Sequence, residues 1–199
     1  MKYPLLRAQA EEAVRRGLLD AAGRLLTDEG PAALSLRRIA SEMACSTTVI
    51  YSLFGNKDGL ANALYLEGFH RLGHALAEVD ENLPPVAYLQ AISRAYRENS
   101  IRSATYYGVM FGGAIPFFKP PPESRRRAWS TLKVTIKAVE RAMKSGEFAP
   151  GDPVKGARLI WAAMHGVVSL QLSGYFVDKD RPKVLFDEAV AGAIQTLRR

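Results

Sequence analysis

Apolar residues recur at helical spacing along most of the chain and predict a protein built only of α-helices. The first stripe predicts a helix from about Ala10 to Glu29 that ends at Gly30-Pro31, and its inward residues are Val14, Leu18, Ala22 and Leu25. A longer helix is expected to run up to Leu83-Pro84-Pro85, with an apolar row of Leu60, Leu64, Leu72, Leu76 and Val79. No segment alternates apolar and polar residues over a convincing length, so we expect no β-strand.

Two short helices are predicted between these long ones. Ser35 can cap the first of them, which turns Leu36, Ile39, Ala40 and Met43 inward and Arg37, Arg38, Ser41 and Glu42 outward. Ser46 can cap the second, Thr47 to Phe54, in which Val49 or Ile50 and Leu53 or Phe54 face the core. Gly55 is expected to stop that helix, and Asn56 to cap the next one.

The rest of the chain predicts further helices around one irregular stretch. A helix from Val86 to about Ala104 is followed by a short aromatic piece at Tyr106–Phe111 and an irregular run from Gly112 to Pro122. Three more helices are expected, over Glu123–Ser145, Pro153–Phe176 and Pro182–Leu197. We therefore divide the chain into an N-terminal domain, residues 1–56, and a helical domain, residues 57–199, connected by the helix that starts at Lys57.

Composition narrows the class of protein. The chain has 199 residues, of which 48% are hydrophobic and 24% are charged, as in a compact globular protein. The single cysteine, Cys45, cannot form an intrachain disulfide, so a cytoplasmic location is expected. The segment from Leu159 to Val177 carries no formal charge, but its polar residues favour a buried helix over a membrane span.

The net charge of +7 is weak evidence for DNA binding, because its excess lies outside the N-terminal helices. Residues 1–60 hold eight basic and seven acidic residues, whereas residues 61–199 hold 19 and 13. The densest basic run, Arg125 to Arg127, is interpreted as a solvated helix start, with a site for an acidic ligand or DNA backbone as the alternative. Any case for DNA must therefore rest on local pattern.

That local pattern is a helix-turn-helix. Two short helices with a tight connection hold the second, Thr47–Phe54, across the first through shared apolar residues, which leaves its opposite face free. This free face is short and polar enough to enter a DNA major groove.

The same residues resemble a known family. The run from Leu36 to Leu60 is similar to the DNA-binding signature of the TetR family of bacterial transcriptional regulators, through Ile39-Ala40, Ser46, Ile50-Tyr51, Phe54, Lys57 and Leu60. Trp161-Ala-Ala-Met-His165-Gly166 also resembles the Trp and His-Gly signature of one class of C-terminal ligand domains in that family.

The resemblance implies a homodimeric regulator that binds a double-stranded operator and releases it when a small molecule binds. DNA contacts are implied for Arg37, Ser46, Thr47, Thr48, Val49, Tyr51 and Lys57. Thr47 and Thr48 would lie closest to base edges, while Tyr51 and Lys57 would contact phosphates. In protein–DNA complexes, contacts to bases determine sequence specificity and contacts to phosphates position the protein on the DNA. The chain departs from the family pattern at Ala44, Cys45 and Ser52-Leu53, so we expect no phosphate contact from Ser52 or Leu53.

Two further sets of residues are expected in the helical domain. An apolar or amphipathic effector is expected near Tyr106, Tyr107, Met110, Phe111, Trp129, Trp161 and His165, for which a packed core is the alternative explanation. A two-fold interface between copies is expected to use Val167, Leu170, Phe186, Val190, Ile194 and Leu197.

Other classes of function have less support. An enzyme is not predicted, because the chain has three histidines and one cysteine and none of the motifs HExxH, GxSxG or GxxxxGK[ST]. No cofactor, metal or membrane partner is expected. An architectural DNA-binding protein without an effector, or a ligand carrier without DNA, stays open as an alternative.

Overall fold

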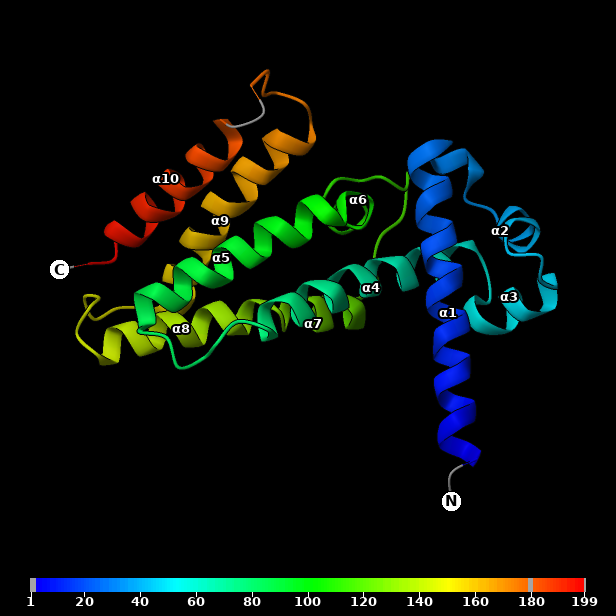
Figure 1. Ribbon diagram of the computed structural model, residues 1–199, viewed down its shortest axis with the longest axis horizontal. Coiled ribbons are helices and arrows are strands. Elements are labelled where there is room, and N and C mark those ends of the chain that lie inside the picture. Colours follow the sequence, from blue (N-terminus) through cyan, green and yellow to red (C-terminus); the bar gives the residue numbers. More distant parts are fainter. Residues whose placement is uncertain (1–2, 179–180, 199) are drawn as a thin grey trace. The chain divides into compact units, whose positions relative to one another are not determined.

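The computed structural model describes residues 3–178 and 181–198, and their regular secondary structure is helical (Figure 1). The order is α1 (Tyr3–Asp28), the 3-10 turn η1 (Pro31–Ala33), α2 (Leu36–Glu42), α3 (Thr47–Phe54), α4 (Lys57–Ala77), α5 (Pro85–Arg102), α6 (Ala104–Phe111), α7 (Pro122–Trp129), α8 (Leu132–Lys144), α9 (Pro153–Leu172) and α10 (Arg181–Gln195). These residues contain no strand, only one isolated β-bridge between Phe148 and Arg198. The all-α prediction is confirmed.

The chain forms two compact units that do not follow the predicted division after Asn56. The first unit comprises the residues up to Gly68 together with Thr105–Arg125, and the second comprises Phe69–Ala104 together with the residues from Arg126 onward. Residues of α6 join the first unit because they pack on α1 and α4. The Tyr106 hydroxyl donates to Asp20 Oδ1 at 3.0 Å, and Met110 lies so close to Gly68 that a Cβ there would be 2.6 Å from its sulfur.

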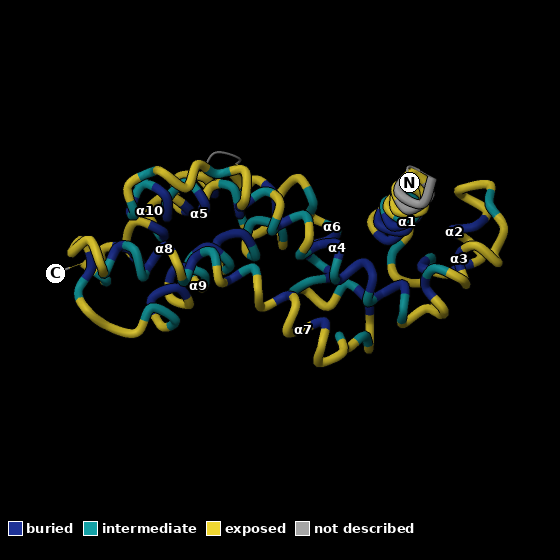
Figure 2. The backbone as a smooth tube through the Cα atoms, turned by 90° about the horizontal axis from the view of Figure 1, so that it is seen from below, coloured by how far each residue is buried: buried dark blue, intermediate teal, exposed yellow. Residues whose placement is uncertain are grey.

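The core of the first unit is formed by one face of each of its first helices, seen as dark segments in Figure 2. Leu18, Leu19, Ile39, Ile50 and Leu60 are at most 1% exposed. Two predicted core positions are wrong. Val14 is 50% exposed because the buried stretch of α1 begins only at Leu18, and Met43 is 37% exposed because α2 has ended before it.

The second unit packs α5, α8, α9 and α10 around a core that includes Leu89, Val139, Phe148, Ile160 and Phe186. Its helices differ from the expected ranges in two places. The predicted helix over Glu123–Ser145 is broken, because the hydroxyls of Ser130 and Thr131 donate to the preceding carbonyls of Arg127 and Ala128. The predicted helix over Pro153–Phe176 ends at Leu172 and is followed by Gly174 with a φ of +77°.

The aromatic segment from Tyr106 to Phe111, for which the sequence predicted no secondary structure, forms most of α6. None of the helices in the described ranges combines the length and apolarity needed to cross a membrane.

Candidate nucleic-acid interface

The turn between α2 and α3 is set by local hydrogen bonds. The Ser35 hydroxyl caps α2 by accepting from the Arg38 amide at 3.2 Å. At the other end, the Ala44 amide donates to the Ser41 carbonyl at 3.2 Å and the Cys45 amide to the Ala40 carbonyl at 3.0 Å. This pair of bonds is a Schellman motif, which ends a helix on a left-handed residue.

Alanine occupies that left-handed position. Ala44 has a φ of +46°, a conformation that costs a residue with a Cβ about 1–2 kcal/mol. The TetR-family signature that this sequence resembles usually has a glycine at this position. The alanine found here therefore introduces backbone strain into the turn.

Helix α3 has one buried and one exposed face. The Ser46 hydroxyl caps it by accepting from the Thr48 amide at 3.1 Å. Ile50 is fully buried and Phe54 is 6% exposed, so the core side of the helix is formed by this pair, four residues apart. The other side presents Ser46, Thr47, Thr48, Val49 and Tyr51, all of them exposed.

The junction between α3 and α4 is fixed by two glycines and an asparagine. Gly55 ends α3 with a φ of +72°, and the Asn56 side chain caps α4 by accepting from the Gly59 amide at 2.9 Å. A Cβ on Gly59 would lie 1.9 Å from the carbonyl oxygen of Phe54, so only glycine fits. The role of Gly59 was not predicted from the sequence, because its contact with Phe54 depends on how closely the end of α3 approaches the start of α4.

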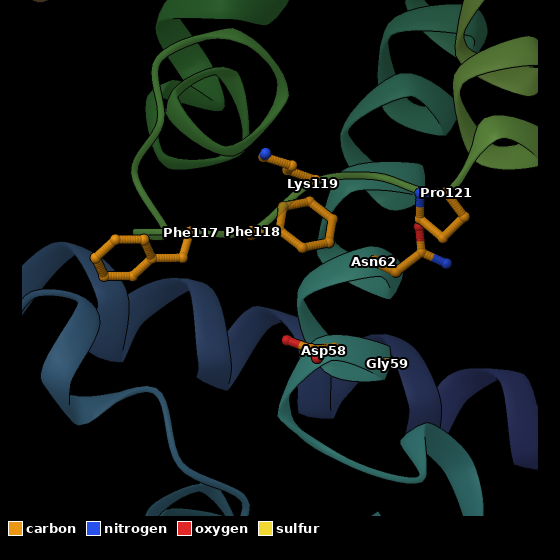
Figure 3. Close-up of a pocket in the computed structure, with 7 residues that line it drawn as sticks. All are labelled: Asp58, Gly59, Asn62, Phe117, Phe118, Lys119 and Pro121. Atoms are coloured by element: carbon orange, nitrogen blue, oxygen red, sulfur yellow. The ribbon is translucent and has the colours of Figure 1, made fainter.

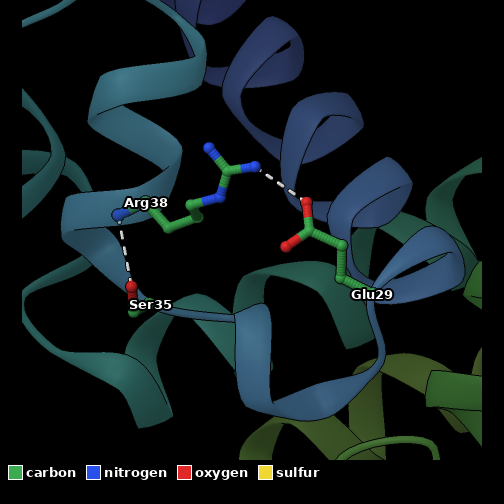
Figure 4. Close-up of polar contacts among 3 residues, drawn as sticks. All are labelled: Glu29, Ser35 and Arg38. Carbon is green, nitrogen blue, oxygen red and sulfur yellow. Dashed lines mark hydrogen bonds and ion pairs between the residues drawn. The ribbon is translucent and has the colours of Figure 1, made fainter.

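Helix α2 is tied to the end of α1 by an exposed ion pair (Figure 4). The Arg38 guanidinium donates to Glu29 Oε1 at 2.8 Å, and this hydrogen bond, with the charge of Glu29, raises the pKa of Arg38. Neighbouring Arg37 is exposed and makes no ion pair with a described residue. Of the two arginines, Arg37 is therefore the one available to a phosphate.

All seven residues predicted to contact DNA are exposed in the first unit, on α2, α3 and the start of α4. Hydroxyl groups and cations on a capped helix and its flanks can donate to phosphate oxygens and base edges. The Ser52 hydroxyl instead donates to the Val49 carbonyl at 2.8 Å, so its own backbone occupies it. Contact of any of these residues with DNA stays a prediction.

Two family descriptions match this chain. "Bacterial regulatory proteins, tetR family" matches residues 18–64, and "Tetracyclin repressor-like, C-terminal domain" matches residues 89–193, which is more than half of the chain. The chain belongs to the TetR family. It is a transcriptional regulator with a DNA-binding helix-turn-helix formed by α2 and α3.

Individual relatives of this TetR-family chain are distant. It is 24% identical to the "HTH-type transcriptional regulator Rv1816" of Mycobacterium tuberculosis, over 91% of each chain. A solved structure from Rhodococcus sp. RHA1, a protein with unknown function, has a TM-score of 0.79 at 26% identity, over 93% of this chain and 95% of that one. The structure of AibR in complex with isovaleryl coenzyme A and operator DNA has a TM-score of 0.65 at 21% identity, over 92% and 97%.

The predicted effector residues of this TetR-family chain fall into both units. In the first unit, Tyr106 and Tyr107 are each 6% exposed, whereas Met110 and Phe111 of the same helix are half-buried. In the second unit, Trp129 is 42% exposed and lies under the Arg158 guanidinium, 5.2 Å from its ring centroid.

Trp161 and His165 form an aromatic pair on α9. Their ring centroids are 5.6 Å apart, and His165 Nδ1 lies 3.4 Å from the Tyr96 hydroxyl. Burial lowers the pKa of His165, which favours the neutral imidazole. This pair packs among side chains of its own unit, and an effector contact stays a prediction.

The predicted dimer residues are for the most part core residues of the second unit. Phe186, Val190 and Ile194 are 1–3% exposed and Val167 is 7% exposed, so their side chains pack within the single chain. Leu197 is half-buried, and only Leu170, at 45%, is largely exposed. Helices α9 and α10 turn these apolar stripes toward each other and toward α5. Contact of any of these residues with a second copy stays a prediction.

Proposed function

We propose that this TetR-family regulator is a homodimeric repressor that binds a pseudo-palindromic operator and releases it when a small apolar or amphipathic molecule binds. The main support for the proposal is that helix α3 buries Ile50 and Phe54 on one side and presents a hydroxyl-rich face to solvent on the other. We infer a cytoplasmic location, since that is where a bacterial regulator meets DNA.

We assign recognition of the operator bases to the first turn of α3. Thr47 and Thr48 occupy the first turn of the capped helix, where side chains of a groove helix reach base edges. Arg37, Tyr51 and Lys57 flank that turn and supply donors for phosphates. In a two-fold dimer, the two half-sites would lie about one helical turn of DNA apart, about 34–36 Å.

Pairing of two copies is supported by the exposed face of α9. Leu159, Ala162, Gly166 and Leu170 follow one another at helical spacing, are all exposed and carry no charge. A Cβ on Gly166 would meet nothing within 4 Å, and the same holds for Gly192 on α10. Glycine within a helix costs about 1 kcal/mol relative to alanine, and close approach of a second copy is a reason to keep it.

Release by an effector requires a molecule that binds the two conformations of the regulator unequally. A tenfold loss of operator affinity corresponds to about 1.4 kcal/mol of coupling. The solved complex of AibR with an acyl coenzyme A and operator DNA supports an amphipathic molecule as the class of effector.

A shift assay with selected and scrambled DNA tests the proposal through three substitutions. Lys57→Ala should weaken binding to all sequences alike, because a phosphate contact carries no sequence information. Thr47→Ala and Thr48→Ala should change the preferred sequence, by about 1–3 kcal/mol for each lost base contact. Uniform weakening by all three would argue against major-groove reading and favour an architectural DNA-binding protein.

A further inference from the structure

A pocket of about 420 Å³ lies in the first unit, between the start of α4 and the segment that follows α6 (Figure 3). The Asn62 Oδ1 atom on its α4 side is enclosed, so a ligand could not reach it. The Phe117 ring is fully exposed and points away from Asp58 and Asn62 (Figure 3). This pocket therefore offers a ligand little to bind, whereas the exposed face of α9 and α10 in the second unit carries a more specific pattern.

Helices α9 and α10 lie side by side and antiparallel in the second unit (Figure 1). Their register is set near Gly156 of α9, whose Cβ would lie 3.3 Å from a side-chain carbon of Leu197, just after the end of α10. Ala162 follows Gly156 by six residues. Gly192 precedes Leu197 by five residues on the antiparallel helix, so it lies at nearly the same height along the pair as Ala162.

The exposed face of this helix pair has small residues at that height. Ala162, Ala191 and Gly192 are exposed, and a Cβ on Gly192 would meet nothing within 4 Å. The distance between two packed helices depends on the side chains at their contact, so small residues allow close approach. The centre of the face is therefore suited to contact with another helix.

Charged side chains of opposite sign flank this centre. Arg158 lies four residues before Ala162, is exposed, and has its guanidinium over the Trp129 ring, 5.2 Å from the centroid, which holds it in place. Glu188 lies four residues before Gly192 and is also exposed. Because the helices are antiparallel, these two charges lie on opposite sides of the centre, each about 6 Å from it along the helix. Neither of them makes an ion pair with a described residue.

We propose that two copies of the chain pair through this face around a two-fold axis at Ala162 and Gly192, with Arg158 of each copy against the partner's Glu188. A two-fold rotation exchanges the two sides of the centre, so it brings a cation and a carboxylate at equal distances from the axis to the same height. The symmetry forms the ion pair twice. This alignment rests on the proposed homodimer and specifies which residues of the two copies meet.

The same axis matches a second pair of opposite charges. Asp152 lies ten residues before Ala162, and Lys183 lies nine residues before Gly192. Both are exposed, and neither makes an ion pair with a described residue. The rotation brings Asp152 to the height of the partner's Lys183. An axis parallel to the helices would instead leave Arg158 at the height of the partner's Arg158, with like charge beside like charge.

Sedimentation equilibrium of the full-length protein tests the alignment through charge reversal. Arg158→Glu and Glu188→Arg should each raise the dimer dissociation constant by about tenfold or more, because like charges then face each other twice across the interface. Both positions are exposed, so each variant should keep the helical circular dichroism of the unaltered protein.

An equimolar mixture of the two variants is the sharper test. In their heterodimer every contact between positions 158 and 188 again joins opposite charges, so its dissociation constant should return to within about threefold of the unaltered value. Arg94 and Glu98, both exposed on α5, supply the matched control. Arg94→Glu, Glu98→Arg and their mixture should all pair like the unaltered protein.

The outcomes distinguish the alignment from the homodimer itself. Unchanged dissociation constants in both reversals, or a mixture that pairs no more tightly than its components, would overturn the alignment and leave the homodimer standing. An unaltered protein that stays monomeric at every concentration would contradict the proposed homodimer, and the alignment with it.

Discussion

Helices α3 and α9 each bury one face and expose the other, but their exposed faces have opposite chemistry. On α3 the exposed face carries the hydroxyls of Thr47, Thr48 and Tyr51, which suit a polar, hydrogen-bonding partner. On α9 the exposed face contains Leu159 and Gly166 and has no charged residue at its centre, so it can pack closely against another apolar surface. This difference matches the two proposed roles, in which the α3 face contacts DNA and the α9 face contacts a second copy of the chain.

The two helices are also held in place in different ways. Helix α3 is only eight residues long and depends on the turns at both ends, whereas α9, with 20 residues, is held by packing against α8 and α10. Changes at the ends of α3 should therefore affect DNA binding, while changes on the face of α9 should affect assembly.

The largest effect is expected at the α3–α4 junction. Gly59→Ala places a methyl group 1.9 Å from the Phe54 carbonyl oxygen, so the junction must shift. The free energy of unfolding should fall by about 3 kcal/mol in a urea titration, and operator binding should be lost.

Gly73→Ala is the matched control on the same helix. The nearest atom to its Cβ is 3.9 Å away, so this variant should be as stable as the unaltered protein or more stable by about 1 kcal/mol. If Gly59→Ala and Gly73→Ala had the same stability and the same operator affinity, the close approach at Gly59 would not be what fixes the position of α3.

The next effect concerns the exposed face of α9 and α10. Gly166→Leu and Gly192→Leu should raise the dimer dissociation constant by about 100-fold, or about 2.8 kcal/mol, in sedimentation equilibrium. The monomer of each variant should be slightly more stable than the unaltered monomer, because leucine has a higher helix propensity than glycine. A Cβ at either position meets no atom of its own chain within 4 Å.

Ala77→Leu adds the same bulk at an exposed position of α4 and should leave assembly unchanged. Dimers of unaltered affinity in both glycine variants would place the pairing surface elsewhere.

A smaller gain in stability is expected in the α2–α3 turn. Ala44→Gly removes the cost of a left-handed alanine and should raise the free energy of unfolding by about 0.5–1 kcal/mol. Ala40→Gly, inside α2, should lower it by about 1 kcal/mol. Operator affinity should not fall in Ala44→Gly, since the turn already has the conformation that glycine favours. A loss of stability in Ala44→Gly would mean that the turn is not strained.

The smallest effect is a pH dependence from His165. Burial lowers its folded-state pKa below the ordinary value of 6.5, so the unfolded chain takes up a proton first as the pH falls. Stability should therefore be highest above pH 6.5 and decrease below it, and His165→Gln should remove part of that decrease. Thermal melts between about pH 5 and pH 8 measure it, and identical profiles of the two proteins would contradict the assignment.

The ends of the short helices could be predicted from sequence because their chemistry is local. The caps at Ser35, Ser46 and Asn56 and the stop at Gly55 depend on hydrogen bonds within a few residues, and all four predictions are confirmed. The constraint at Gly59 could not be predicted in this way, because it arises from the approach of another helix end.

The apolar faces could be predicted only in part. Periodicity identified the stripe of α10 with Phe186, Val190 and Ile194, but it could not distinguish a stripe that packs within the chain from one that meets a second copy. The surface proposed for pairing includes Gly166 and Gly192, and only coordinates reveal that nothing of the same chain lies near them.

Selection of bound fragments from random DNA reports base reading by α3 and two-fold pairing of the protein in a single experiment. The expected result is an inverted repeat with half-sites centred about 10 base pairs apart, and a changed half-site sequence for Thr48→Ala. Enrichment of single, unpaired sites, or the same sequence for Thr48→Ala as for the unaltered protein, would contradict it.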